Sequence, residues 1–390
     1  MIQSDTAFVS DVSLGTEYSC PWVEFLSLSH FRCYESLSLQ VDRRPVVLTG
    51  DNGAGKTNIL EALSFLSPGR GLRRSKLSQP THFHHMDKGW SVFAKVSVDG
   101  LLEDIGTGII AGGGSEDRRV IKLNQTAISQ SDLMKLVTVF WMTPQIDQLL
   151  NESMGTRRRF FDKLVASFLP EHTQHLSRYE YAIRERARLL KENRGDDQWL
   201  SILEQKMAQE GMAIFSLRQL FLDAISPLVQ LSSSGFPKVK IYLEGALESL
   251  SGQKSALEAE DEIQHFLKRS RAEDGRLGST PLGPHQTQVQ FFHIDGKKNA
   301  EFCSTGEQKA LLLSLILANC RLHRLHKGKT PIVLLDEVVA HLDEERRGNL
   351  YKEILGLGLQ CWMTGTEEKV FAPFGHAAQY LYVHQGKVSR

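Results

Sequence analysis

The sequence predicts an α/β fold that is assembled from both ends of the chain, with a mainly helical segment inserted between them. A glycine-rich turn at residues 50–57 follows the short apolar run 46–49. A second apolar run, 331–335, ends in Asp336 and Glu337, 280 residues after Lys56. Residues 156–232 are rich in Leu, Ala, Arg, Glu and Gln at helical spacing. Since a compact nucleotidase carries such motifs much closer together, the two ends are predicted to form one site around a large insertion.

The glycine-rich turn matches the phosphate-loop pattern G-x-x-x-x-G-K-[ST]. Its glycines let the backbone turn tightly and direct N–H groups at phosphate oxygens, and the helix expected at 58–63 adds a dipole that favours an anion. Lys56 is expected to reach the β- and γ-phosphates, and the Thr57 hydroxyl to bind Mg²⁺. The sequence therefore predicts an ATP site that contains Gly50, Asp51, Asn52, Gly53, Ala54, Gly55, Lys56 and Thr57.

The second apolar run is typical of a buried parallel strand. Asp336 would then emerge at the carboxyl end of the strand, where α/β sheets bind ligands, and could hold Mg²⁺ directly or through water. Glu337 would be placed to polarise the water that attacks the γ-phosphate. The predicted catalytic residues are Glu337, Lys56, Asp336 and Ser304.

Ser304 opens a Ser/Gly turn, residues 303–309, which leads into a long apolar helix. This turn resembles the signature motif of ATP-binding-cassette ATPases. The resemblance implies that Ser304 and Gly306 contact the γ-phosphate held by a second subunit. Residues 338–343 resemble the D-loop of that superfamily, a subunit contact that ends in Asp343. Residues 360–366 are expected to form the last strand and its turn, where Thr364 or Thr366 stands in place of the histidine of transporter cassettes.

Within that superfamily the chain resembles the RecF family over residues 22–390. The family's motifs are matched, some imperfectly, by residues 28–34 (N-F-R-N-Y), 58–62 (N-[IL]-L-E-A), 69–73 (G-R-S-x-R), 143–147 with 157–162 (P-x-D…R-R-x-[FY]-[LF]-D) and 283–287 (G-P-H-R-D). His30 and Cys33 replace asparagines in the first motif, and Gln286 and Thr287 replace Arg and Asp in the last. The resemblance implies a nucleotide contact by Arg32 and a Mg²⁺ contact by Gln145.

The same resemblance implies an ABC-type head like those of SMC and Rad50 proteins. We expect a flexible extension at 1–21, the head at 22–165 and 273–390, and a helical arm at 166–272. The implied function is an ATP-dependent homodimer with weak, DNA-stimulated ATPase activity that binds gapped DNA or single-strand/duplex junctions and acts with RecR to load RecA. A structural SMC- or Rad50-like tether and a generic ABC-type ATPase are the alternatives; the arm is short for a tether, and the motif spacing is too long for a transporter cassette.

The formal net charge is zero, so DNA binding is expected to depend on a local basic patch. Arg70, Arg73, Arg74 and Lys76 are the leading candidates, although Arg70 or Arg73 could instead serve the nucleotide. The run 157–159 and the arginines of the arm helix are further candidates. The five cysteines lack C-x-x-C spacing, which favours reduced thiols in a cytoplasmic protein. No apolar run approaches the roughly 18 residues of a membrane span, so no membrane association is expected.

Overall fold

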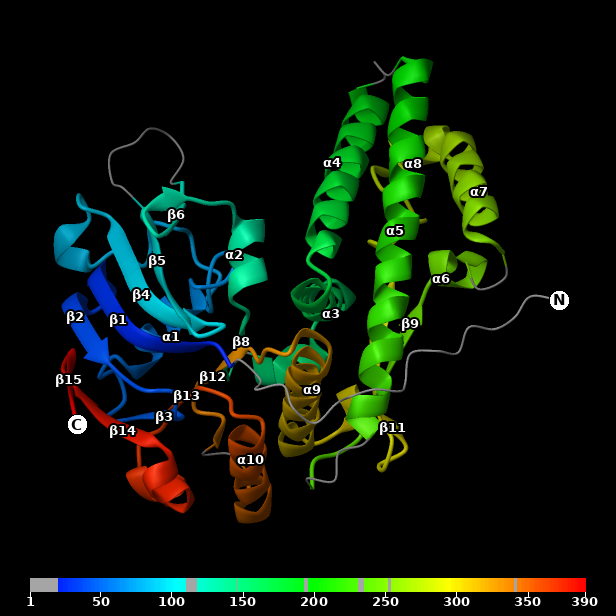
Figure 1. Cartoon of the computed structure of the whole chain (residues 1–390). Coiled ribbons are helices and arrows are strands. Elements are labelled where there is room, and N and C mark those ends of the chain that lie inside the picture. The colour runs from blue at the N-terminus through cyan, green and yellow to red at the C-terminus, as the bar shows by residue number, and fades with distance from the viewer. Residues whose placement is uncertain are drawn as a thin grey trace.

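The central layer is a six-stranded sheet that joins both ends of the chain (Figure 1). The computed structural model describes residues 20–109, 118–144, 146–192, 196–230, 235–251, 254–339 and 342–390. The strand order is β15 (Lys387–Ser389), β14 (Gln379–His384), β3 (Val46–Thr49), β13 (Cys361–Thr364), β12 (Ile332–Leu335) and β8 (Val139–Met142). All neighbours pair in parallel except β15, which is antiparallel to β14.

A second, antiparallel sheet packs near the N-terminal half of the head. Its order is β2 (Tyr34–Gln40), β1 (Trp22–Phe31), β4 (Trp90–Val98), β5 (Leu101–Ile109), β6 (Val120–Leu123) and β7 (Thr126–Ala127). Helix α1 (Lys56–Ser64) shares one apolar cluster with both sheets. Helix α2 (Gln130–Leu136) leads from β7 into β8.

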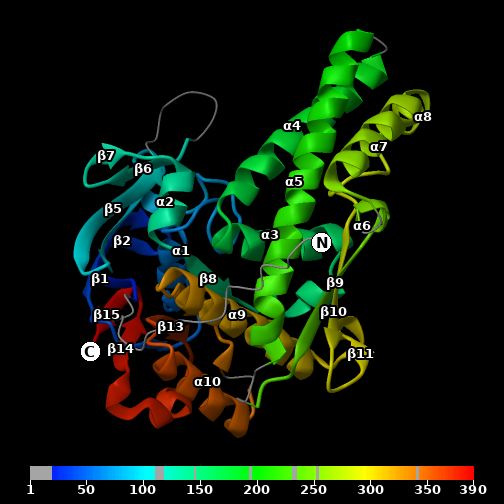
Figure 2. The ribbon, with the colours of Figure 1, turned by 45° about the vertical axis from the view of Figure 1, so that its right-hand side comes forward.

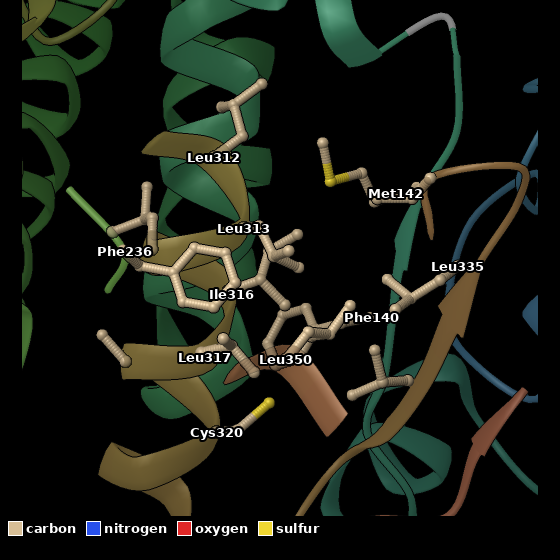
Figure 3. Packing of buried hydrophobic residues seen from close by; sticks show 14 of the residues in the cluster. Phe140, Met142, Phe236, Leu312, Leu313, Ile316, Leu317, Cys320, Leu335 and Leu350 are labelled. Atoms are coloured by element: carbon tan, nitrogen blue, oxygen red, sulfur yellow. The ribbon is translucent and has the colours of Figure 1, made fainter. Parts of the chain in front are cut away.

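Each central strand sends alternate side chains to opposite faces of the sheet, as strand geometry requires. Leu48, Leu334 and Trp362 pack toward α1 and the antiparallel sheet. Val47, Leu335 and their neighbours on the other face pack against α9 (Thr305–Lys327) and α10 (Glu344–Gly356). Figure 3 shows the α9 side chains Leu313 and Ile316 facing residues of β8 and β12. The sheet is therefore buried on both faces, which explains why its strands are continuous apolar runs.

The inserted segment forms an arm that projects from the head (Figures 1 and 2). Helices α4 (Glu171–Glu192) and α5 (Asp197–Gln230) form the long pair and rise from the short helix α3 (Met154–Phe168). Helices α6 (Ala246–Ser251), α7 (Ala256–Arg269) and α8 (Arg271–Leu277) return along them. Three antiparallel strands lie near the base of the arm: β9 (Val239–Glu244), β10 (Gln288–His293) and β11 (Lys298–Asn299).

Buried ion pairs join the helices of the arm. Arg186 on α4 bonds Glu204 on α5 at 3.0 Å and Asp274 on α8 at 2.6 Å, and all three side chains are buried. Arg271 adds a second contact to Glu204, at 2.7 Å. By length and composition alone, α5 could cross a membrane. Its paired charges and its packing between α4 and α7 indicate instead the core helix of the arm.

The structure forms strands from both apolar runs, at 46–49 and 332–335, and corrects two details. Residues 361–364 are not the last strand, because β14 and β15 follow them. The phosphate-loop helix begins at Lys56 rather than at Asn58. In the arm, helices α7 and α8 meet at Ser270. The predicted arm, 166–272, begins inside α3 and ends inside α8. The domain boundaries stay a prediction. The 3₁₀ turns are Phe83–His85, Ile146–Asn151, Ala300–Phe302 and Glu368–Ala377.

Candidate functional site

The predicted phosphate-binding and acidic motifs meet at one edge of the central sheet. The phosphate loop follows β3, and Asp336 and Glu337 follow β12. Strand β13 lies between these two strands and ends at Thr364. Since the three strands are parallel, their carboxyl ends emerge together, which is where α/β sheets bind ligands. Segments 280 residues apart are thus brought to one site.

The phosphate loop is held in shape by its neighbours. Gly50 has a φ of 138°, and a Cβ there would collide with the backbone carbonyl of Val383 on β14. Gly55 has a φ of 116°, and its carbonyl accepts a hydrogen bond from the Tyr34 hydroxyl at 3.1 Å. Gly53, in contrast, has no atom within 4 Å of a Cβ position, so its backbone is open to a ligand. The loop therefore combines fixed ends with an accessible middle.

Lys56 is buried and lies across the loop. Its ammonium donates to the carbonyl oxygens of Gly50 at 2.6 Å and Asp51 at 2.8 Å. Burial lowers the pKa of Lys56, and the negative charges of Glu337 and Asp336 oppose that shift. The lysine and the acidic motif therefore act on each other within the same site.

Thr364 links the Asp336 carboxylate to the backbone of Glu337. Its hydroxyl donates to Asp336 Oδ1 at 2.9 Å and accepts the backbone N–H of Glu337 at 2.9 Å. The Thr57 hydroxyl also donates to Asp336 Oδ1, at 2.8 Å. Burial raises the pKa of Asp336, although the two hydroxyl hydrogen bonds favour its ionised form. Glu337 has a φ of 55°, a left-handed backbone conformation that is uncommon for a residue other than glycine and is often found at functional sites.

This donor set fits a nucleotide with Mg²⁺. The open backbone at Gly53 and the N-terminus of α1 suit phosphate oxygens. The Thr57 hydroxyl and the Asp336 carboxylate are adjacent oxygen donors, the ligand type that Mg²⁺ prefers. Gln145, the other predicted Mg²⁺ contact, lies outside the described residues.

Ser304 is the N-cap of α9 and lies on the surface. Its hydroxyl oxygen accepts the Glu307 N–H, and the Glu307 carboxylate accepts the Ser304 N–H at 2.7 Å, which completes a capping box. Lys298 approaches Glu307 at 3.0 Å. The backbone hydrogen bond from Ser304 and the contact with Lys298 lower the pKa of Glu307 to about 2. The Ser304 hydroxyl also contributes to this lowering, so Ser304 is bonded to Glu307 while it stays exposed at the surface.

Two predicted nucleotide contacts, Arg32 and Asp343, have other roles within this chain, and a third, Gly306, is unobstructed. Arg32 forms a double hydrogen bond with the buried carboxylate of Glu61, at 2.6 and 2.8 Å. Asp343 caps α10 by accepting the Arg346 N–H. Gly306, in the first turn of α9, has open space around it. Nucleotide contacts by these residues stay predictions; of the D-loop segment, 340 and 341 lie outside the described residues.

The four basic residues of the cluster at 70–76 have different surroundings. Arg73 approaches Glu61 at 3.3 Å, and its charge also acts on Asp336, which places it on the nucleotide side of the cluster. Arg74 lies near the cations of α3, since Arg159 contributes to lowering its pKa after burial does. Arg70 and Lys76 are exposed. DNA contact by any of the four stays a prediction.

Sequence reasoning missed two partners of the site. Glu61 was expected only as part of a motif, but it anchors both Arg32 and Arg73. Its only sequence signal was an acid inside an otherwise apolar helix. The Thr364 hydrogen bonds could not be predicted, because nothing in the sequence specifies that β13 lies between β3 and β12.

The comparisons with known proteins agree with this geometry. Residues 22–388 match the family described as RecF/RecN/SMC N terminal domain. A protein of Rhizobium meliloti (strain 1021) named DNA replication and repair protein RecF is 44% identical over 93% of this chain and 97% of its own length. The protein of the same name from Agrobacterium fabrum is 42% identical, with the same coverage.

Solved structures show the same fold. A structure described as the recombination mediator protein RecF-ATP in the RecFOR pathway has a TM-score of 0.81 at 22% identity, over 97% of this chain and 99% of that one. The Smc head domain of Pyrococcus furiosus has a TM-score of 0.53 at 17% identity, over 95% of each chain.

Fold and motifs together define an ABC-type phosphate-loop ATPase head of the SMC kind that carries a helical arm. Within that class, the chain belongs to the RecF family of DNA replication and repair proteins.

Proposed function

We propose that this protein is an ATP-dependent DNA clamp in which two chains close on two nucleotides. The observation that carries the proposal is the contrast between Lys56 and Ser304. Lys56, Thr57, Asp336 and Glu337 converge at one sheet edge. Ser304 is exposed, and its hydrogen bonds are to Glu307 among the described residues. A site that needs both groups would be completed by a second chain.

Each residue then has a defined task at the closed interface. Lys56 and the loop N–H groups bind the phosphates, and Thr57 and Asp336 hold Mg²⁺, which offsets phosphate charge when bound. Thr364 fixes the orientation of Asp336 and the backbone of Glu337. The Glu337 carboxylate orients a water and accepts its proton. The exposed Ser304 hydroxyl of the second chain donates to the γ-phosphate in place of Glu307, so nucleotide binding joins the chains and hydrolysis releases them.

The DNA part of the proposal rests on the family. RecF relatives are named DNA replication and repair proteins, and a solved neighbour is described as a recombination mediator. We propose that the closed dimer holds gapped DNA or a single-strand/duplex junction through the cluster at 70–76, and that it acts with RecR to promote RecA loading in the cytoplasm. The paired helices α4 and α5 contain only 22 and 34 residues, or about 33 and 51 Å, which weighs against a long tether.

The test is the oligomeric mass in Mg²⁺ with no nucleotide, ADP or ATP, with and without gapped DNA. The proposal predicts a dimer only with ATP, which Glu337→Gln prolongs and Ser304→Arg abolishes. The trapped dimer should retain gapped DNA, and neutralising Arg70 and Lys76 should weaken that retention without affecting dimer mass. A monomer under every condition would contradict the clamp. A nucleotide-dependent dimer that does not bind gapped DNA would contradict only the DNA-binding part of the proposal.

A further inference from the structure

A cavity of about 660 Å³ lies where the head meets the base of the arm. Its walls come from the segment after α1, from α2 and β8 of the head, and from α3, α4 and the loop at 284–285. Figure 1 shows these elements around the junction, with α2 and α4 on opposite sides. The volume is in the range of small-molecule sites, and none of the residues that line it belongs to the proposed nucleotide site.

Three cationic side chains of α3 line this cavity: Arg158, Arg159 and Lys163. Both guanidinium groups lie near Gly155, since Arg159 Nη1 and Arg158 Nη2 are 3.5 and 3.8 Å from the position of a Cβ at that glycine. Arg158 donates to the carbonyl oxygen of Thr287 at 3.0 Å. The Lys163 ammonium lies 2.8 Å from the ring centre of Trp141. The cations are therefore held in place by neutral partners.

Among the described residues, no carboxylate forms an ion pair with any of these three cations. Asp162, on the same helix, is paired with Arg218 at 2.9 Å and hydrogen-bonded to His172. Glu180 is the other acid of the lining and is exposed on α4. Positive charge therefore remains in excess in a partly buried place, where it is unfavourable without an anion.

The electrostatics of the cluster favour the binding of an anion. Burial, followed by the charge of Arg74, lowers the pKa of Lys163 well below its ordinary value. Burial also lowers the pKa values of Arg74 and Arg158, and Arg159 adds to both shifts. Arg74 is thus a fourth cation near the cluster. A bound anion would oppose all of these shifts.

Part of the remaining wall is apolar, beside polar residues such as Gln130 and Thr173. Met134, Val137, Phe140, Leu176 and Pro284 line the cavity beside the cations. Paired guanidinium groups suit the oxygens of a phosphate, and the apolar wall suits a planar or hydrocarbon body. The cavity thus offers one charged end and one apolar end to the same ligand.

We propose that this cavity binds an organic phosphate of nucleotide size, with its phosphate on Arg158, Arg159 and Lys163 and its body against Val137 and Leu176. The phosphate belongs either to a free nucleotide or to the terminal nucleotide of a DNA strand, which present the same chemistry here. The site is separate from the phosphate loop and does not depend on dimer formation.

The test uses Lys56→Ala protein, so that the phosphate loop does not take up the probe. Thymidine 5′-monophosphate and a short oligonucleotide, with and without a 5′-phosphate, are titrated by calorimetry. We expect one site per chain, weakened roughly tenfold by Arg159→Gln and again by Lys163→Met, because each removes a charge-assisted contact. Arg188→Gln is the matched control, since Arg188 is exposed on α4 and pairs with Glu185 and Glu192.

The two probes distinguish the sources of the phosphate. Binding of the free nucleotide supports a small-molecule site, whereas binding of only the 5′-phosphorylated strand supports a strand-end site. Thermal melting verifies that each variant is folded, and Arg159→Gln is the safer variant because Arg159 is exposed. The proposal would be overturned if neither probe bound at millimolar concentration. It would also be overturned if the folded Arg159→Gln and Lys163→Met variants bound the probe with unchanged affinity.

Discussion

The phosphate-loop edge of the sheet and the N-terminus of α9 are built in opposite ways. At the sheet edge, Lys56, Asp336 and Thr364 are buried and linked by hydrogen bonds across three strands. At the N-terminus of α9, Ser304 is exposed and bonded to its own first turn. The first region is organised across three strands of one chain, whereas the second presents an exposed serine at the surface. Under the proposed clamp, binding needs one chain and turnover needs two.

Replacement of Glu337 by Gln should have the largest effect. A glutamine cannot accept the proton of the attacking water, so the rate of hydrolysis should fall about 10²- to 10⁴-fold. Nucleotide affinity should change little, because the Glu337 carboxylate does not donate a hydrogen bond to the phosphates. Single-turnover hydrolysis and nucleotide titration measure the two quantities separately. An equal loss of nucleotide affinity and hydrolysis rate would show that Glu337 acts in nucleotide binding rather than only in hydrolysis.

Lys56→Ala should remove binding itself. Loss of a buried ammonium contact with phosphate should cost about 2–3 kcal/mol, or roughly 30- to 150-fold in affinity. Lys95→Ala, at an exposed position on β4, is the charge-matched control. Calorimetry with a slowly hydrolysed ATP analogue measures the change. Unchanged affinity would mean that the phosphate loop does not bind the nucleotide.

Thr364→Val tests the link between the Asp336 carboxylate and the Glu337 backbone. The substitution keeps the shape of the side chain but leaves Asp336 with one hydroxyl donor and the Glu337 N–H without its partner. We expect stability to fall by about 1–3 kcal/mol and hydrolysis to fall roughly tenfold. Thr366→Val, at an exposed position, should leave both unchanged. Equal effects of the two substitutions in denaturation and hydrolysis assays would contradict this role.

The capping box at Ser304 should show the smallest effect, and it depends on pH. The pKa of Glu307 is depressed to about 2, so its ionised form stabilises the folded state above the ordinary carboxyl pKa. That contribution, about 1 kcal/mol for such a cap, should be lost as the pH falls from about 4.5 toward 2. The stability difference between wild type and Glu307→Gln should shrink over this window. A difference that is constant with pH would show that the carboxylate charge has no part in the cap.

Much of the head could be predicted from the sequence because its signals are local. The phosphate loop, the strand before Asp336 and the cap at Ser304 each depend on neighbouring residues, and the structure places them as expected. The pairing of Arg32 with Glu61 and the position of Thr364 depend on strand order and helix packing, which have no local signature. The cavity likewise combines segments from residues 67 to 285. The expectation that two chains assemble came from the family resemblance, because the residues of one chain do not by themselves specify a partner chain.

The most direct test of a shared site is to mix two inactive variants. Glu337→Gln chains retain Ser304 but lack the base, and Ser304→Arg chains retain the base but lack the donor. If each site uses residues of both chains, a mixed dimer contains one intact site, so mixing before ATP is added should restore hydrolysis to as much as about a quarter of the wild-type rate. A mixture that hydrolyses ATP no faster than the sum of its separate components, or full activity of Ser304→Arg alone, would contradict the account.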